Sequence, residues 1–215
     1  MRSIAQKINT RKQLWILPVY GLIYMLAFRF LEKNIAAPGS FHLIHCPLDD
    51  RIPFVEFFVI FYLSWFIYMT LAYGFFMFVN KDAREFHLMF ALTSIGMTIF
   101  LITSAVWPNG LDIRPTTFPR DNVFVTLVKY LYSKDTPTNV FPSIHVFNSL
   151  AVYLSARSCR MLQSHRIVYR ITGIWALLII LSTAFVKQHS LYDIFAGIIL
   201  CLVLYMILYR PWKQK

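Results

Sequence analysis

The sequence predicts an all-α, polytopic membrane protein, a bundle of six transmembrane helices with both termini in the cytoplasm. Of its 215 residues, 58% are hydrophobic and only 14% are charged, whereas a soluble domain carries about 25% charged residues. Several apolar runs approach the roughly 20 residues that a helix needs to cross a bilayer. No internal repeat or low-complexity linker divides the chain, so we treat residues 1–215 as one domain.

Six apolar runs are the expected spans. The clearest are Phe57 to Val79, which contains no charged residue, and Leu88 to Trp107. Four others are less clear and borrow flanking residues, namely Leu14 to Leu31, Phe141 to Ala156, Ile171 to Val186 and Leu191 to Tyr209. Pro or Gly within such runs is compatible with a membrane helix.

The basic residues predict the orientation. The net charge is +11, and most of the 21 lysines and arginines flank the apolar runs on the side that a cytoplasmic N-terminus makes internal. The loop of residues 108–140 is then external. No basic face interleaved with stacking aromatic residues is present, which argues against a nucleic-acid partner. The lack of an Asn-x-Ser/Thr sequon gives no support for a glycosylated eukaryotic ectodomain, and the short loops favour a bacterial cell membrane.

His189 and Asp193 begin the last span, and four-residue spacing puts them on one face of a helix. A carboxylate that accepts a hydrogen bond from one imidazole nitrogen makes the other nitrogen a better nucleophile or base. In membrane-spanning segments such ionisable residues are costly and usually functional. The alternative is a histidine that only satisfies a buried aspartate.

The run Pro142-Ser143-Ile144-His145 predicts a helix start, with proline in the first turn. Free backbone N–H groups at a helix start bind anions. Ser143 can add a hydroxyl donor, and His145 can protonate a leaving oxygen. The alternative is an ordinary helix cap with a histidine at the membrane interface.

Arg114 precedes Pro115 in the longest polar stretch, Pro108 to Asn139. Its planar guanidinium fits phosphate oxygens, although a solvated loop arginine is the alternative. Within this stretch, Asn122 to Tyr132 mixes apolar and cationic residues. It either lies in the membrane interface as a lid or only covers the bundle.

Asp49 and Asp50 precede the second span on the same expected side. They either bind a polar head group, such as an inositol or choline-like alcohol, or cap the second helix. His42 and His45 lie nearby, but no carboxylate spacing supports a metal site. We therefore predict no metal and no cofactor.

Together, Arg-Pro, Pro-Ser-x-His and His-x-x-x-Asp occur in the order found in the type 2 phosphatidic acid phosphatase superfamily. The chain resembles that superfamily from about Arg114 to Gly197. Within the superfamily, its motifs resemble those of the branch of inositol phosphorylceramide and sphingomyelin synthases. The resemblance implies these roles: nucleophile His189, orienting residue Asp193, acid His145, and phosphate ligands Arg114 and Ser143.

Three positions depart from the phosphatase branch. Trp107 stands where that branch has a lysine, Thr183 where it has an arginine, and Ile144 where it has a glycine. Lys187 is a candidate replacement cation, because it is expected one helical turn beyond Thr183 on the same face. The changes favour the phosphotransferase branch.

We therefore expect an integral membrane lipid phosphatase or phosphotransferase with a phosphohistidine intermediate at the outer face. Its substrate is a lipid phosphate, pyrophosphate or phosphodiester, and its acceptor is water or an alcohol such as inositol. Two alternatives are a membrane transporter or channel, in which buried ionisable residues line a path, and a catalytically inactive lipid-binding relative.

Overall fold

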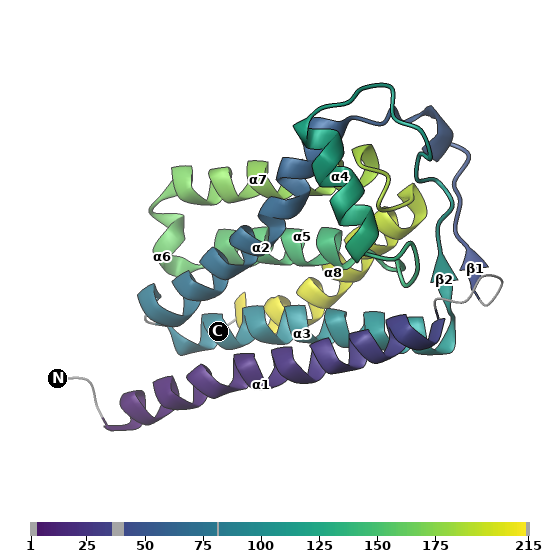
Figure 1. Ribbon diagram of the computed structural model, residues 1–215. Coiled ribbons are helices and arrows are strands. Elements are labelled where there is room, and N and C mark those ends of the chain that lie inside the picture. Colours follow the sequence, from purple (N-terminus) through teal and green to yellow (C-terminus); the bar gives the residue numbers. More distant parts are fainter. Residues whose placement is uncertain (1–3, 36–40, 81, 214–215) are drawn as a thin grey trace.

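The protein is an elongated bundle of helices (Figure 1). The structure is a computed structural model, and it describes residues 4–35, 41–80 and 82–213. The α-helices are α1 (Ile4–Ile35), α2 (Val59–Gly74), α3 (Ala83–Val106), α4 (Val123–Lys134), α5 (Ile144–Ser158), α6 (Arg160–Gln163), α7 (Arg166–Phe185) and α8 (Leu191–Lys213). The short elements are strands β1 (His42–Leu43) and β2 (Asn109–Gly110), the 3₁₀ turns η1 (Asp49–Arg51) and η2 (Glu56–Phe58), and the π-helical turn η3 (Phe75–Val79).

The prediction of an all-α fold with several helices able to span a membrane is confirmed at this level. Within the described residues, five helical segments are long and apolar enough to cross a membrane: Trp15–Asn34, Glu56–Val79, Ala83–Val106, Arg166–Phe185 and Leu191–Arg210. Many of their large side chains point outward, as Trp15, Phe66 and Ile207 do. Apolar outer faces of this kind suit a lipid environment, because they gain nothing from contact with water.

The expected span Phe141 to Ala156 needs correction. Its helix, α5, begins only at Ile144 and has 15 residues, which gives a length of about 22 Å. That is shorter than a bilayer core of about 30 Å. Helix α5 packs against α2, α3, α7 and α8 and is the most enclosed of the long helices. Its sequence is less uniformly apolar because its side chains face protein.

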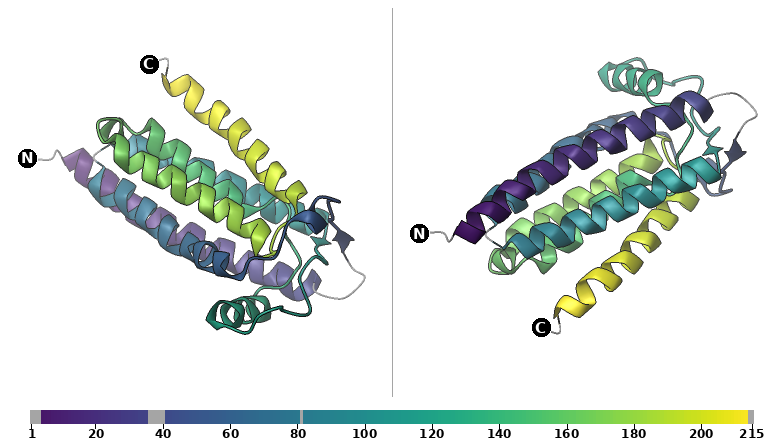
Figure 2. Two further views of the ribbon diagram at one scale, coloured as in Figure 1. Left: turned by 90° about the horizontal axis from the view of Figure 1, so that it is seen from above. Right: turned by 90° about the horizontal axis from the view of Figure 1, so that it is seen from below.

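Helix α1 lies along the outside of the bundle beside α3 (Figure 2). Tyr20 makes polar contacts between the two helices: its hydroxyl donates to the Ser94 carbonyl oxygen at 2.7 Å and lies 3.1 Å from the Thr98 hydroxyl. Helix α1 begins, and α8 ends, at the same end of the bundle as α6 (Figures 1 and 2).

The connections that carry the sequence motifs gather at the opposite end, around β1, β2 and α4 (Figure 1). The two strands pair in parallel, with His42 opposite Asn109. The Asn109 side-chain oxygen accepts hydrogen bonds from the N–H groups of Val140 and Phe141, each at 2.9 Å. These hydrogen bonds hold in place the segment that leads into α5.

Gly197 allows the start of α5 to approach α8. A Cβ atom there would lie 2.8 Å from the Ser143 carbonyl oxygen, which is backbone and moves only with the helix. We expect Gly197→Ala to destabilise the protein by about 1–3 kcal/mol and to shift Ser143. Thermal unfolding of the purified protein in detergent measures this. Gly74→Ala is the control, because a Cβ at Gly74 meets nothing within 4 Å; equal destabilisation by the two changes would contradict the prediction.

Candidate active site

His189 and Asp193 form a buried pair at the start of α8. The His189 Nδ1 atom lies 2.6 Å from Asp193 Oδ2. An ionised carboxylate only accepts, so Nδ1 is the donor in this contact, and in the neutral imidazole Nε2 then presents its lone pair. The expected arrangement on one helix needs correction, since His189 lies two residues before α8 begins. The pair forms because the chain turns into the helix there.

The second histidine, His145, lies in front of this pair. Its Nδ1 atom is 3.5 Å from His189 Nε2. The His145 ring lies against two aromatic rings of α2, with centroid distances of 4.6 Å to Tyr62 and 4.7 Å to Trp65. These contacts hold the imidazole in one orientation, which a group that must donate a proton along one direction needs.

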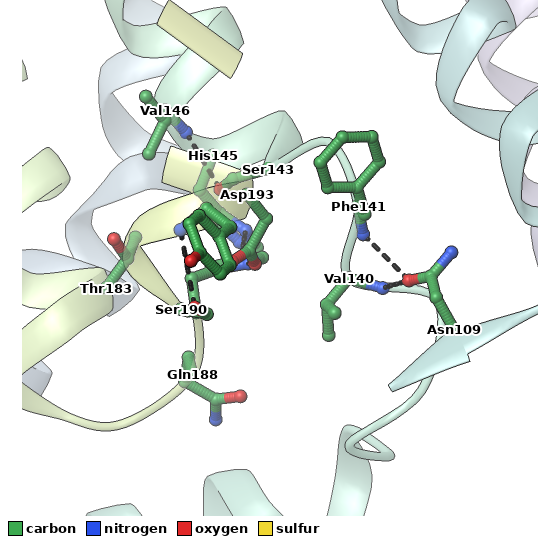
Figure 3. A network of polar contacts seen from close by, with 12 residues as sticks. Asn109, Val140, Phe141, Ser143, His145, Val146, Thr183, Gln188, Ser190 and Asp193 are labelled. Atoms are coloured by element: carbon green, nitrogen blue, oxygen red, sulfur yellow. Dashed lines mark hydrogen bonds and ion pairs between the residues drawn. The ribbon is translucent and has the colours of Figure 1, made fainter. Parts of the chain in front are cut away.

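Ser143 joins the two histidine motifs directly. Its backbone N–H donates to the Asp193 carbonyl oxygen at 3.1 Å, and its hydroxyl oxygen accepts from the Val146 N–H at 3.4 Å as the N-cap of α5. Pro142 precedes this cap, so the prediction that it lies in the first helical turn is wrong. Figure 3 shows Ser143, His145 and Asp193 close together where α5 and α8 begin.

Arg114 is held by a cradle of acceptors. Its guanidinium donates to the carbonyl oxygens of Asp135 at 2.7 Å and Thr136 at 3.3 Å, and to the Gln188 side-chain oxygen at 2.5 Å. It also lies 4.6 Å from the Tyr132 ring centroid. Burial lowers the pKa of Arg114 while Asp135 opposes that shift, and the group remains a cation.

Asp135 links Arg114 to the histidines through α2. One of its carboxylate oxygens lies 4.0 Å from Arg114 Nη2 and accepts from the Tyr62 hydroxyl at 3.5 Å. Tyr62 in turn contacts the His145 ring. Burial raises the pKa of Asp135, and the Arg114 charge opposes this. Arg114 therefore belongs to the same cluster as the histidine pair.

Lys187 is not on the face of α7 where the sequence put it. Helix α7 ends at Phe185, and Lys187 has a φ of 52°. Its ammonium donates to the carbonyl oxygens of Asp49 and Ile52, each at 2.6 Å. Burial lowers the pKa of Lys187, and Asp49 opposes that shift. The Lys187 ammonium therefore binds the loop before α2.

Asp49 caps α8 rather than the second helix. It is 2% exposed, and its carboxylate accepts from the Ser190 hydroxyl at 2.5 Å and from the backbone N–H groups of Leu191 and Cys46, each at 2.9 Å. These three donors occupy the Asp49 carboxylate, which the sequence predicted as a possible head-group ligand. Asp50 is exposed instead and lies 3.1 Å from His45.

Asp49 and Lys187 together bind the loop before α2 to the loop that carries His189. We expect Lys187→Met to cost about 1–3 kcal/mol of stability, because it removes two hydrogen bonds from a charged donor, and the Asp49 carbonyl oxygen keeps only the Ile52 N–H. Thermal unfolding in detergent measures the change. Lys129→Met is the matched control, since the Lys129 side chain is 54% exposed and lies 4.0 Å from an exposed Asp121. An unchanged unfolding temperature for Lys187→Met would contradict this role.

Sequence reasoning missed four residues of the cluster: Tyr62, Trp65, Asp135 and Gln188. Tyr62 and Trp65 are two aromatic residues in an aromatic-rich apolar run, and Asp135 is one carboxylate in a polar loop. Only Gln188 carried a signal, because it directly precedes His189. Among the described residues, no group of three or more His, Cys, Asp or Glu side chains is arranged to hold a metal ion.

The chain matches no protein-family model, and no curated protein and no solved structure is significantly similar to it. Its chemistry is therefore inferred from the residues themselves. A histidine that is oriented by a carboxylate can act as a nucleophile or base. A second imidazole 3.5 Å away can move a proton, and a nearby guanidinium can bind an oxyanion.

Proposed function

We propose that this protein is an integral membrane phosphoryl-transfer enzyme that acts on a lipid phosphate, pyrophosphate or phosphodiester. The observation that carries the proposal is the row of side chains Asp193, His189 and His145, in contact at 2.6 and 3.5 Å, with Arg114 held in the same cluster. The motif order that resembles the type 2 phosphatidic acid phosphatases supports the same chemistry.

In the proposed reaction His189 Nε2 attacks phosphorus, and a phosphorus–nitrogen bond forms as the bond to the leaving oxygen breaks. His145 donates its proton to that oxygen. In-line displacement sets the nucleophile and the leaving oxygen on opposite sides of phosphorus. The substrate therefore has to part the two imidazoles from their 3.5 Å contact. In the second step water or an alcohol, such as inositol, gives a proton to His145, and its oxygen bonds to phosphorus as the phosphorus–nitrogen bond to His189 breaks.

The proposal includes six membrane passes, made by the five long apolar helices and by the shorter, enclosed α5, and an extracytoplasmic site in a bacterial cell membrane. An even number of passes agrees with α1 beginning and α8 ending at the same end of the bundle (Figures 1 and 2). The basic residues near α6, including Arg157, Arg166 and Arg170, favour a cytoplasmic location for that end. The starts of α5 and α8, where the histidines lie, are at the other end (Figure 1).

The experiment that tests the function is an assay of the purified full-length protein against a panel of phospholipids, with and without inositol. Free phosphate scores hydrolysis, and a new lipid scores transfer. We expect turnover of at least one lipid, and its loss in the His189→Ala protein. If the folded protein turned over no lipid and formed no covalent phosphorus adduct, the proposal would be contradicted.

Arg114 is expected to stabilise charge on the phosphoryl oxygens. Arg114→Met should lower kcat/KM by about 10²–10³, the usual effect of removing one such donor. Arg114→Lys should not restore activity, because an ammonium cannot reproduce the planar contacts to Asp135, Thr136 and Gln188. Arg120→Met is the control, since the Arg120 side chain is 71% exposed and pairs with Glu56. Full activity of Arg114→Met would exclude this role.

A further inference from the structure

We propose that a groove between α2, α5 and α7 holds one acyl chain of an anionic phospholipid, which stays bound to the protein as a structural lipid. The groove lies in the half of the bundle that contains α6, whereas the histidines lie where α5 and α8 begin. The bound lipid is therefore distinct from the substrate, and its binding does not depend on the proposed reaction.

The groove has a volume of about 250 Å³, and its walls are almost wholly apolar. Leu71 and Ala72 line it from α2, Val152 lines it from α5, and Val168 and Ile171 line it from α7. An engineered apolar cavity of about 150 Å³ binds benzene. The groove therefore has room for a longer piece of hydrocarbon.

The polar side-chain groups in the walls already have partners within the protein. The Tyr68 hydroxyl donates to the carbonyl oxygens of Ser149 and Thr172, each at 3.2 Å. The Thr172 hydroxyl and the Trp175 ring N–H also donate to protein oxygens. A polar ligand would find no free side-chain donor among the described residues of the walls and would lose its hydration. A hydrocarbon chain needs no such donor.

The groove opens toward lipid. Its α2 and α7 walls belong to segments that are long and apolar enough to cross a membrane, and Leu71, Val168 and Ile171 at its rim are exposed. In a bilayer these residues face hydrocarbon rather than water. At the end nearer the histidines, the Tyr68 hydroxyl joins α2 to the backbones of α5 and α7. The chain therefore enters from the side or from the end near α6.

The end of the bundle beside the groove is basic. Its exposed arginines are Arg157 at the end of α5, Arg160 in α6, and Arg166 and Arg170 at the start of α7. Residues 136–192 contain no Asp or Glu. Asp82 and Glu85 approach from α3, but Asp82 caps that helix and Glu85 is buried. Basic clusters beside membrane helices attract anionic head groups, which is why we assign an anionic lipid.

Helix α5 forms the floor of the groove through Val152 and Ala156. The same helix carries Ser143 and His145 at its other end. An acyl chain in the groove makes dispersion contacts with this floor and with both walls, and these contacts are lost when the groove is empty. The lipid is therefore expected to hold α5 against α2 and α7 and to stabilise the fold.

Native mass spectrometry tests the proposal on the purified full-length protein in detergent, equilibrated with phosphatidylglycerol and phosphatidylcholine that carry the same oleoyl chains. We expect one phosphatidylglycerol to stay bound and phosphatidylcholine to be retained at least about tenfold less. Phosphatidylglycerol should also raise the unfolding temperature, because it binds the folded state. Absence of a retained lipid, or equal retention of the two lipids, would overturn the proposal.

Ala72→Leu fills the groove and should lower retention of phosphatidylglycerol by at least about tenfold, since the chain can bury less apolar area. Thr70→Leu is the matched control, because Thr70 is exposed on α2 and does not line the groove. Phosphatidylglycerol with hexanoyl chains gives the same comparison on the unaltered protein and should also be retained at least about tenfold less. Undiminished retention in either comparison would overturn the proposal.

His189→Ala should retain the lipid as the unaltered protein does. A loss there would place the lipid at the histidines and overturn the proposal, whatever the protein's activity. A dimer that Ala72→Leu dissociates, with no lipid bound, would assign the groove to a second copy of the chain and also overturn it.

The head group is tested by replacing Arg166 and Arg170 together with glutamine, which should remove most of the preference for phosphatidylglycerol. Replacing Arg29 and Arg51 together with glutamine is the control, because it removes the same charge from exposed positions nearer the opposite end of the bundle. An unchanged preference in the first protein, or an equal loss in the control, would overturn the assignment of an anionic lipid.

Discussion

His189→Ala is expected to lower turnover of the lipid substrate by at least about 10⁴-fold, because it removes the atom that bonds to phosphorus. Asp193→Asn should also lower turnover, by about 10⁴-fold, although asparagine has nearly the same shape as aspartate. An amide facing Nδ1 no longer holds the imidazole in the tautomer that leaves Nε2 free. The 2.6 Å contact between Nδ1 and Asp193 Oδ2 makes the two residues one unit.

The measurement is kcat/KM with the best lipid of the panel, on variants whose unfolding temperatures match that of the unaltered protein. His165→Ala is the matched control, since His165 is exposed at the start of α7, away from the cluster. Substantial turnover by a folded His189→Ala protein would show that another group attacks phosphorus. A large loss in His165→Ala would show that the assay reports folding instead.

His145→Ala is the second large effect, with an expected loss of about 10²–10⁴ in kcat, the usual contribution of a general acid. The loss should depend on the leaving group. A substrate that releases a weakly basic alcohol, such as a nitrophenol, needs no proton, so His145→Ala should regain most of its rate with that substrate.

His189→Ala should show no such recovery, because a better leaving group does not replace a missing nucleophile. The contrast between the two variants therefore separates their roles within a single experiment. If His145→Ala were equally slow with natural and activated leaving groups, proton donation by His145 would be wrong. The 3.5 Å contact with His189 would then serve only to position the nucleophile.

Local patterns predicted the parts of this molecule that depend on neighbouring residues. Long apolar runs marked the membrane helices, and five of the six expected spans correspond to helices of sufficient length. The four-residue spacing of His189 and Asp193 predicted their contact. The alternation of spans predicted that Ser143 and His189 would lie at the same end of the bundle. Both contact Asp193 in the first turn of α8.

Such local patterns could not predict contacts between segments that are distant in the sequence. Lys187 turned away from the helix face because the backbone leaves α7 two residues earlier, and its partners are carbonyl oxygens, which have no sequence signature. Two partners of the Asp49 carboxylate, Ser190 and Leu191, lie more than 140 residues away in the sequence. The run Phe141 to Ala156 was read as a span, although α5 begins at Ile144 and is short, because residues buried in protein and residues facing lipid can be equally apolar.

The most direct test of the account is to find the phosphorus on the enzyme. The purified protein is mixed with lipid substrate and quenched in alkali, which preserves phosphohistidine, and its peptides are mapped by mass spectrometry. The account predicts a phosphorus adduct on His189, and none in the His189→Ala protein. Turnover with no adduct, or an adduct on a different residue, would contradict it.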